Sequence, residues 1–131
     1  MSITEQGIAG ERLARKILKG LQVDDIFQAD WIVKKGGSYY VVEVKHKEIY
    51  RPPPFYGHGL DIRQVKARQK FYKETGIRCL FLVLDKSGKR YWGWLDELEE
   101  GKHIDTEHGI RVYDIKGFHE LGQPTTKNQS A

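Results

Sequence analysis

The sequence has very little cysteine: Cys79 is the only one among 131 residues. A single cysteine excludes an intrachain disulfide and a cysteine-based zinc site, which favours a reducing compartment. We therefore expect a cytoplasmic protein, or one in the host cytoplasm if the chain is viral. No apolar run approaches the roughly 20 residues of a membrane helix, and the first residues lack the basic and apolar regions of a signal peptide. We expect no membrane association.

Phosphate-binding loops of known type are also missing, because neither a Walker motif nor Gly-x-Gly-x-x-Gly occurs. The charged fraction of 31% and the apolar fraction of 39% fit a globular domain. We expect one domain over residues 1–121 and a flexible polar tail over 122–131. The formal charge of +4 permits nucleic acid or another polyanion as a partner.

Hydrophobic periodicity and turn residues predict the order helix, hairpin, helix, strand, strand. This order indicates the α/β (α+β) class, with a mixed central β-sheet and flanking helices. The expected helices cover 4–21 and 61–75, with a short helical turn at 96–100. The expected strands cover 31–35, 38–45, 78–85, 90–95 and 110–115, and a proline-rich loop covers 49–59.

The most informative segment is the expected hairpin, whose two strands flank Gly36 and Gly37. A Gly-Gly pair favours a two-residue turn, because both residues accept a positive φ. That turn sets Asp30 opposite Glu43, and directly opposed residues point to the same face of a sheet. Lys45 lies two residues past Glu43 and shares this face. A three-residue turn would instead shift the pairing and separate the two acids.

Two adjacent carboxylates and an amine have a functional interpretation as a metal site. Carboxylate oxygens suit Mg²⁺ or Mn²⁺, and Lys45 would orient a water or offset negative charge. The alternative is a solvated hairpin face, since an acid two residues before a lysine recurs at Glu100 and Asp114. The apolar strand around Glu43 and the opposed Asp30 favour the metal site.

Two further polar residues, Glu11 and Gln64, border apolar helix faces. Glu11 lies beside Leu18 on the helical wheel and would join the metal site through water, or else stabilise its helix by pairing with Arg15. Gln64 points with apolar neighbours toward the sheet and its acids, but with Asp61 it also resembles a capping box. Both interpretations stay open for each residue.

Two groups of residues could contact nucleic acid. The first is a basic row on one face of the second helix, which would follow a phosphate backbone or simply face solvent. It consists of Arg63, Lys66, Lys70 and Lys73. The second belongs to the proline-rich loop, whose aromatics would stack on bases or pin the loop to the core. It consists of Arg51, Tyr56 and His58.

These motifs together resemble the PD-(D/E)XK nuclease superfamily over roughly residues 5–85. Asp30 matches the motif aspartate, although Ala29 replaces the frequent proline. Glu43, Val44 and Lys45 match the (D/E)-x-K signature. Glu11 stands where many members carry a first-helix glutamate, and Gln64 or Gln69 stands where some carry a polar residue in the next helix. In size and layout the chain is similar to Holliday junction resolvase-like and short phage or virus-type nucleases.

The resemblance implies a metal-dependent endonuclease that hydrolyses DNA phosphodiester bonds and is structure-specific for branched or junction DNA. It implies that Asp30, Glu43 and the carbonyl of Val44 hold Mg²⁺ or Mn²⁺. Lys45 would position the attacking water, and Glu11 and Gln64 would complete the catalytic set. By analogy it also suggests a homodimer. The alternative function is a non-catalytic nucleic-acid-binding protein on the same scaffold.

Overall fold

The structure is a computed structural model that describes residues 3–24 and 29–122. Its helices are α1 (Ile3–Gly20), α2 (Ile62–Thr75), α3 (Leu95–Glu100) and the short 3-10 helix η1 (Ile115–Gly117). Its strands are β1 (Trp31–Lys35), β2 (Ser38–Lys47), β3 (Gly57–Asp61), β4 (Cys79–Asp85), β5 (Arg90–Trp94), β6 (His103–Asp105), β7 (Ile110–Asp114) and β8 (His119–Leu121). The expected tail lies almost wholly outside the described residues.

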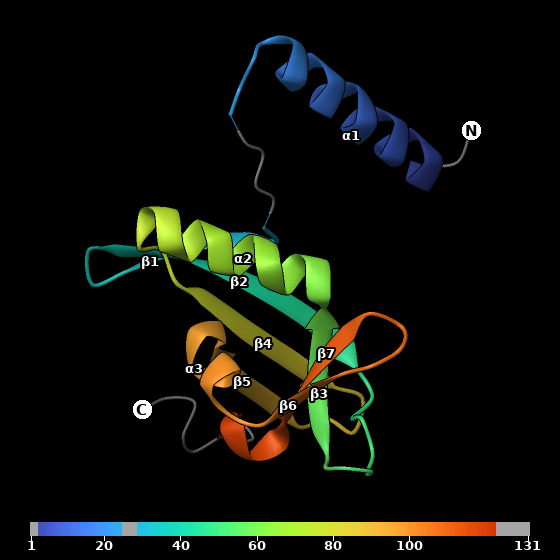
Figure 1. The fold of residues 1–131 in the computed structure, drawn as a ribbon, viewed down its shortest axis with the longest axis vertical. Helices are drawn as coiled ribbons and strands as arrows, with labels where there is room; N and C mark the ends of the chain where they lie inside the picture. Colours follow the sequence, from blue (N-terminus) through green and yellow to red (C-terminus); the bar gives the residue numbers. More distant parts are fainter. Residues whose placement is uncertain (1–2, 25–28, 123–131) are drawn as a thin grey trace, which may run out of the picture.

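The larger sheet has the strand order β1-β2-β4-β5-β8. Strands β2 and β4 are parallel, and the other neighbouring pairs are antiparallel. The chain crosses from β2 to β4 through β3 and α2, and α2 lies across one face of the sheet (Figure 1). A mixed central sheet with flanking helices confirms the predicted α/β (α+β) class.

The hairpin β1–β2 has the predicted two-residue turn. Gly36 and Gly37 have φ values of 60° and 83°, which L-residues with a side chain rarely adopt. The turn pairs Lys35 with Ser38, and the register continues to the start of β1. Extended by one residue beyond β1, this register sets Asp30 opposite Glu43, as the sequence predicts.

The helix α2 begins and ends where the sequence indicates. The Asp61 carboxylate accepts a hydrogen bond from the main-chain N–H of Arg63 and caps the first turn. Gly76 ends the helix in the left-handed conformation, with φ of 76°. Val65 is buried in the main core, so α2 is anchored to the sheet through this face.

The hydrophobic core lies on the sheet face that α2 and α3 cover. It includes Val41 of β2 and Cys79, Phe81 and Val83 of β4. The opposite face carries apolar side chains that no described element covers. These include Trp31, Val33, Leu84 and Leu121, all exposed.

A second, three-stranded sheet with the order β3-β7-β6 was not predicted. Its β3 begins at Gly57, so the predicted loop over 49–59 is too long at its C-terminal end. A Cβ at Gly57 would lie only 2.1 Å from the carbonyl oxygen of Tyr113, which shows how closely β3 approaches β7. Gly57 and Gly59, which were expected in the loop, instead lie in β3 and permit its close packing against β7.

Helix α1 stands apart from both sheets (Figure 1). Its apolar side chains Leu13, Ile17 and Leu18 are exposed rather than packed on the sheet. In the described part of the chain, no helix is long and apolar enough to cross a bilayer.

Candidate active site

Strand β2 turns Glu43 and Lys45 toward the covered face of the larger sheet. Their neighbours across β4 are Phe81 and Val83, which belong to the core. Asp30 joins them from the start of β1, where its Oδ2 accepts a hydrogen bond of 2.9 Å from the main-chain N–H of Val44. The hairpin register and this hydrogen bond therefore bring the two predicted acids together.

Glu43 is a carboxylate in a nearly dry environment, with only 1% of its surface exposed. Burial raises the pKa of its carboxyl group, and the Arg68 guanidinium opposes that shift. The Asp30 carboxylate, within hydrogen-bonding reach, raises the pKa of Glu43 further, and the Lys45 ammonium lowers it. The Glu43 carboxylate thus interacts electrostatically with one anionic side chain, Asp30, and two cationic side chains, Arg68 and Lys45.

Arg68 is a site residue that the sequence reasoning missed. Its Nε lies 2.9 Å from Glu43 Oε1, and both side chains are almost fully buried. Neither atom makes an aligned hydrogen bond to any described group, so the contact is an ion pair. The available signal was its position one helical turn after Gln64, which directs both side chains to the same side of α2.

An open cleft of about 660 Å³ lies beside this ion pair. Lys45, Gln64 and Arg68 line it, as do Arg63 and Arg15. Gln64 is half-buried and lines the same cleft as Lys45, as the functional interpretation of Gln64 requires. Asp61 supplies the helix cap, and most of the charged groups around the cleft are cationic. Such a cleft suits an anionic ligand.

The residues present fit a hard divalent cation. Asp30 and Glu43, together with the main-chain carbonyl of Val44, would offer oxygen donors of the kind Mg²⁺ prefers. Glu43 Oε1 makes no aligned hydrogen bond, but the Arg68 guanidinium lies against it, so an ion bound to this oxygen would share it with Arg68. Across the described residues, no group of three His, Cys, Asp or Glu side chains gathers around one point, so protein carboxylates alone would leave the coordination incomplete.

Glu11 does not accompany the two acids. Its side chain is exposed on α1, which stands away from the sheets (Figure 1). Arg15, one turn further along α1, is the residue of this helix that lines the cleft. The contribution of Glu11 to the metal site therefore stays a prediction, because α1 stands apart from the sheets that carry Asp30 and Glu43.

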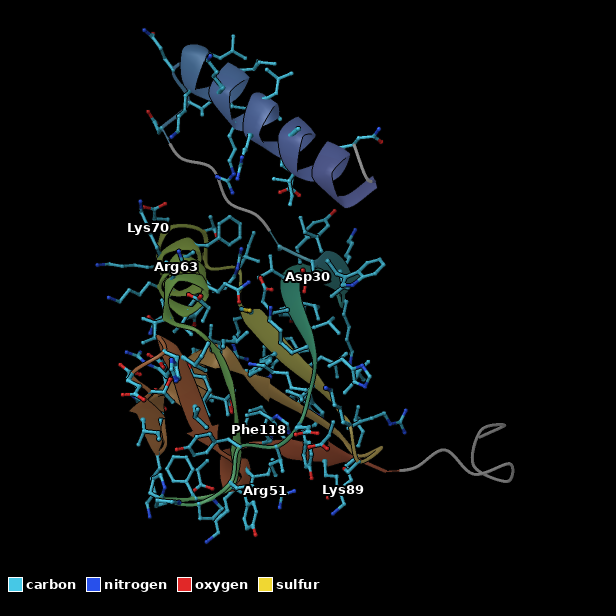
Figure 2. The ribbon with its side chains drawn as sticks, turned by 90° about the vertical axis from the view of Figure 1, so that its right-hand side faces the viewer. Asp30, Arg51, Arg63, Lys70, Lys89 and Phe118 are labelled. Atoms are coloured by element: carbon cyan, nitrogen blue, oxygen red, sulfur yellow. The ribbon has the colours of Figure 1, made fainter. Side chains whose placement is uncertain are left out.

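The predicted basic row lies on the outer side of α2. Lys66, Lys70 and Lys73 are exposed, and the Arg63 side chain is 91% exposed while it pairs with Asp61. Figure 2 shows Arg63 and Lys70 at the same end of the sheet as Asp30. The row is therefore exposed to solvent at the end of the sheet that carries Asp30.

The predicted loop group is not brought to the acids. Arg51 lies at the opposite end of the molecule from Asp30 in Figure 2, and Tyr56 is 48% exposed in the same loop. His58 is not in a loop at all, because it belongs to β3 and is 1% exposed. Its Nε2 lies 2.7 Å from Asp85 Oδ2, so this side chain ties β3 to β4. The prediction that His58 contacts nucleic acid directly is wrong for this buried position.

No family model matches the sequence, and no curated protein matches it. Among solved structures, the chain is similar to Hjc from Archaeoglobus fulgidus, a Holliday junction resolvase from an archaeal hyperthermophile. The match has 16% identity and a TM-score of 0.49, and covers 86% of this chain and 92% of that one. At this similarity, the function must be inferred from the residues of this chain.

Proposed function

We propose that this protein is a divalent-metal-dependent endonuclease that hydrolyses DNA phosphodiester bonds, with branched or junction DNA as its substrate class. One observation carries the proposal: Asp30, Glu43 and Lys45 gather on one face of a hairpin beside a cationic cleft. Their types and spacing are those of the PD-(D/E)XK nucleases that the sequence resembles.

Each residue has a role in this mechanism. Asp30, Glu43 and the carbonyl of Val44 would hold Mg²⁺ or Mn²⁺, which supplies charge stabilisation at the phosphoryl group when bound. Lys45 orients the attacking water by donating a hydrogen bond to it and offsets the negative charge that develops on the phosphate oxygens. Gln64, which lines the same cleft, donates a hydrogen bond that helps to fix the water or the phosphate.

The substrate reaches these groups along α2. The basic row beside the cleft offers the Arg63 guanidinium and three lysine ammonium groups to phosphates that flank the cleaved bond. Contacts of this kind position a strand without selecting its sequence, which suits recognition of DNA by shape. The homodimer and the cytoplasmic location stay predictions, and light scattering of the purified protein tests the first of them.

The test incubates the protein with plasmid, linear duplex, single-stranded, flap and four-way-junction DNA in Mg²⁺ or Mn²⁺. We expect cleavage that EDTA abolishes and that Glu43→Gln and Lys45→Ala each abolish without loss of the fold. Asp114→Asn and Lys89→Ala are matched controls that should cut normally, because Asp114 caps η1 and Lys89 lies in the turn between β4 and β5.

Two results would contradict the proposal. Full activity in EDTA would rule out metal-dependent cleavage. Binding of DNA without cleavage of any substrate would instead favour the alternative, a non-catalytic nucleic-acid-binding protein on this scaffold.

A further inference from the structure

The buried ion pair between Arg68 and Glu43 is an unusual feature for a site that would attract cations. Arg68 is 5% exposed and Glu43 is 1% exposed, so solvent screens this pair little. Other arginines of the fold have partners outside the site: Arg78 pairs with Asp96 and Glu97, and Arg111 with Glu99 and Asp105. Arg68 alone among these three places its guanidinium on an acid of the proposed active site.

The formal charges around Glu43 balance. Asp30 and Glu43 contribute two negative charges, and Lys45 and Arg68 contribute two positive charges. All three neighbours are electrostatically coupled to Glu43. A divalent ion that entered this site alone would leave an excess of two positive charges in a poorly solvated place, which is electrostatically unfavourable. A phosphate group that arrived together with the ion would offset part of that excess.

We propose that Arg68 is a positioning residue that keeps the acid pair charge-balanced, so that the divalent ion and a DNA phosphate enter the site together. This inference rests on the proposed function and deepens it. In the absence of DNA, Arg68 holds the Glu43 carboxylate in place and weakens the attraction of the site for a free ion. In the presence of DNA, the phosphate charge compensates for the two basic groups, and the ion binds tightly.

The first experiment measures binding of Mn²⁺ to the DNA-free protein at pH 8 by electron paramagnetic resonance. Arg68→Met removes the charge and keeps most of the side-chain volume. We expect its Mn²⁺ affinity to rise roughly tenfold, because a unit charge and a divalent ion about 5 Å apart repel appreciably even at a water-like dielectric constant. Arg68→Lys keeps the charge and should bind Mn²⁺ as the wild type does.

Arg63→Met is the matched control on the same helix. Arg63 lines the same cleft, but its guanidinium pairs with Asp61 in an exposed position. We expect Mn²⁺ affinity within twofold of the wild type for this variant. An Arg68→Met protein that is folded by circular dichroism and binds Mn²⁺ no more tightly than the wild type would overturn the inference.

The second experiment uses the wild-type protein and does not depend on the folding of any variant. Fluorescence anisotropy measures the affinity for a four-way junction with and without Ca²⁺, under conditions where the DNA stays intact. Linkage requires the ion to strengthen DNA binding by the same factor as DNA strengthens ion binding. We expect Ca²⁺ to raise the affinity for the junction at least tenfold. Equal DNA affinity with and without Ca²⁺ would overturn the inference.

The outcomes separate this inference from the proposed function. If the wild type cuts DNA and Glu43→Gln does not, the nuclease proposal stands whatever Arg68 does. In that case an unchanged Mn²⁺ affinity in Arg68→Met removes only the role of Arg68. If no substrate is cut in any metal, the nuclease proposal itself fails.

Discussion

The main-chain N–H of Val44 donates a hydrogen bond of 2.9 Å to the carboxylate of Asp30. This bond joins the start of β1 to the centre of β2, at the position where the hairpin register sets Asp30 beside Glu43. It fixes the direction of the Asp30 side chain, because the main-chain N–H of Val44 holds Oδ2. The hairpin thus supplies both the spacing and the orientation of the two acids.

We predict that Asp30→Asn separates the structural role of Asp30 from its chemical role. The amide oxygen still accepts from the N–H of Val44, so the free energy of unfolding should change by less than about 1 kcal/mol. The negative charge is removed, and cleavage should fall on the order of 100-fold or more because metal stabilisation of the phosphoryl group is worth several kcal/mol. Urea unfolding and single-turnover cleavage measure the two effects. Wild-type activity in Asp30→Asn would remove Asp30 from the site.

The turn at Gly36 and Gly37 offers a test of the register. Gly37→Val forces a β-branched residue to a φ of 83° and should cost about 1–2 kcal/mol of stability, with a loss of cleavage because Asp30 moves relative to Glu43. Gly36→Asn produces the Asn-Gly pair preferred in such turns and should be neutral. Thermal unfolding of both variants checks this prediction, and equal stability would show that the turn does not control the hairpin.

The buried pair of His58 and Asp85 predicts how stability depends on pH. Burial lowers the pKa of His58 below its ordinary value of 6.5, although Asp85 partly opposes this shift. The unfolded chain therefore binds more protons near that pH, so the free energy of unfolding should fall as the pH drops through 6.5 and level off below the folded-state pKa. For Asp85, burial would raise the pKa, but hydrogen bonds from Ser87 and His58 outweigh it and lower the pKa. A further loss of stability should follow as the pH falls below 3.8.

Urea unfolding between pH 7 and 5.5 measures the histidine part of this dependence. His58→Gln should flatten the slope, because the substituted side chain does not titrate. His108→Gln is the matched control, since the His108 side chain is 84% exposed and should leave the slope unchanged. A wild-type slope in His58→Gln would assign the effect to another group.

The basic row on α2 predicts the salt dependence of DNA binding. Lys66→Ala combined with Lys73→Ala should weaken binding to every DNA substrate and reduce the slope of log K against log salt by about 0.9 for each phosphate that the variant no longer neutralises. Lys86→Ala combined with Lys89→Ala removes the same charge from the turn between β4 and β5. Figure 2 shows Lys89 at the far end of the molecule from Lys70, so this control should keep the wild-type slope. Equal effects of the two pairs would mean that net charge, not this face, attracts DNA.

The sequence by itself determined the local features of this protein. Gly36 and Gly37 dictated the turn, and the turn dictated the register that pairs the acids, because a two-residue loop permits few geometries. Asp61 and Gly76 fixed the limits of α2 in the same way, through a side-chain cap and a left-handed residue. These signals act over a few residues and can be read without knowledge of the rest of the chain.

Only the tertiary structure decided which distant side chains meet. Arg68 reaches Glu43, and His58 reaches Asp85, because the crossover from β2 to β4 carries β3 and α2 over the larger sheet. No sequence pattern singled out Arg68, and His58 was expected in a loop, since periodicity cannot reveal a partner more than twenty residues away. Burial of both residues follows from the packing of two sheets and a helix, which no local pattern specifies.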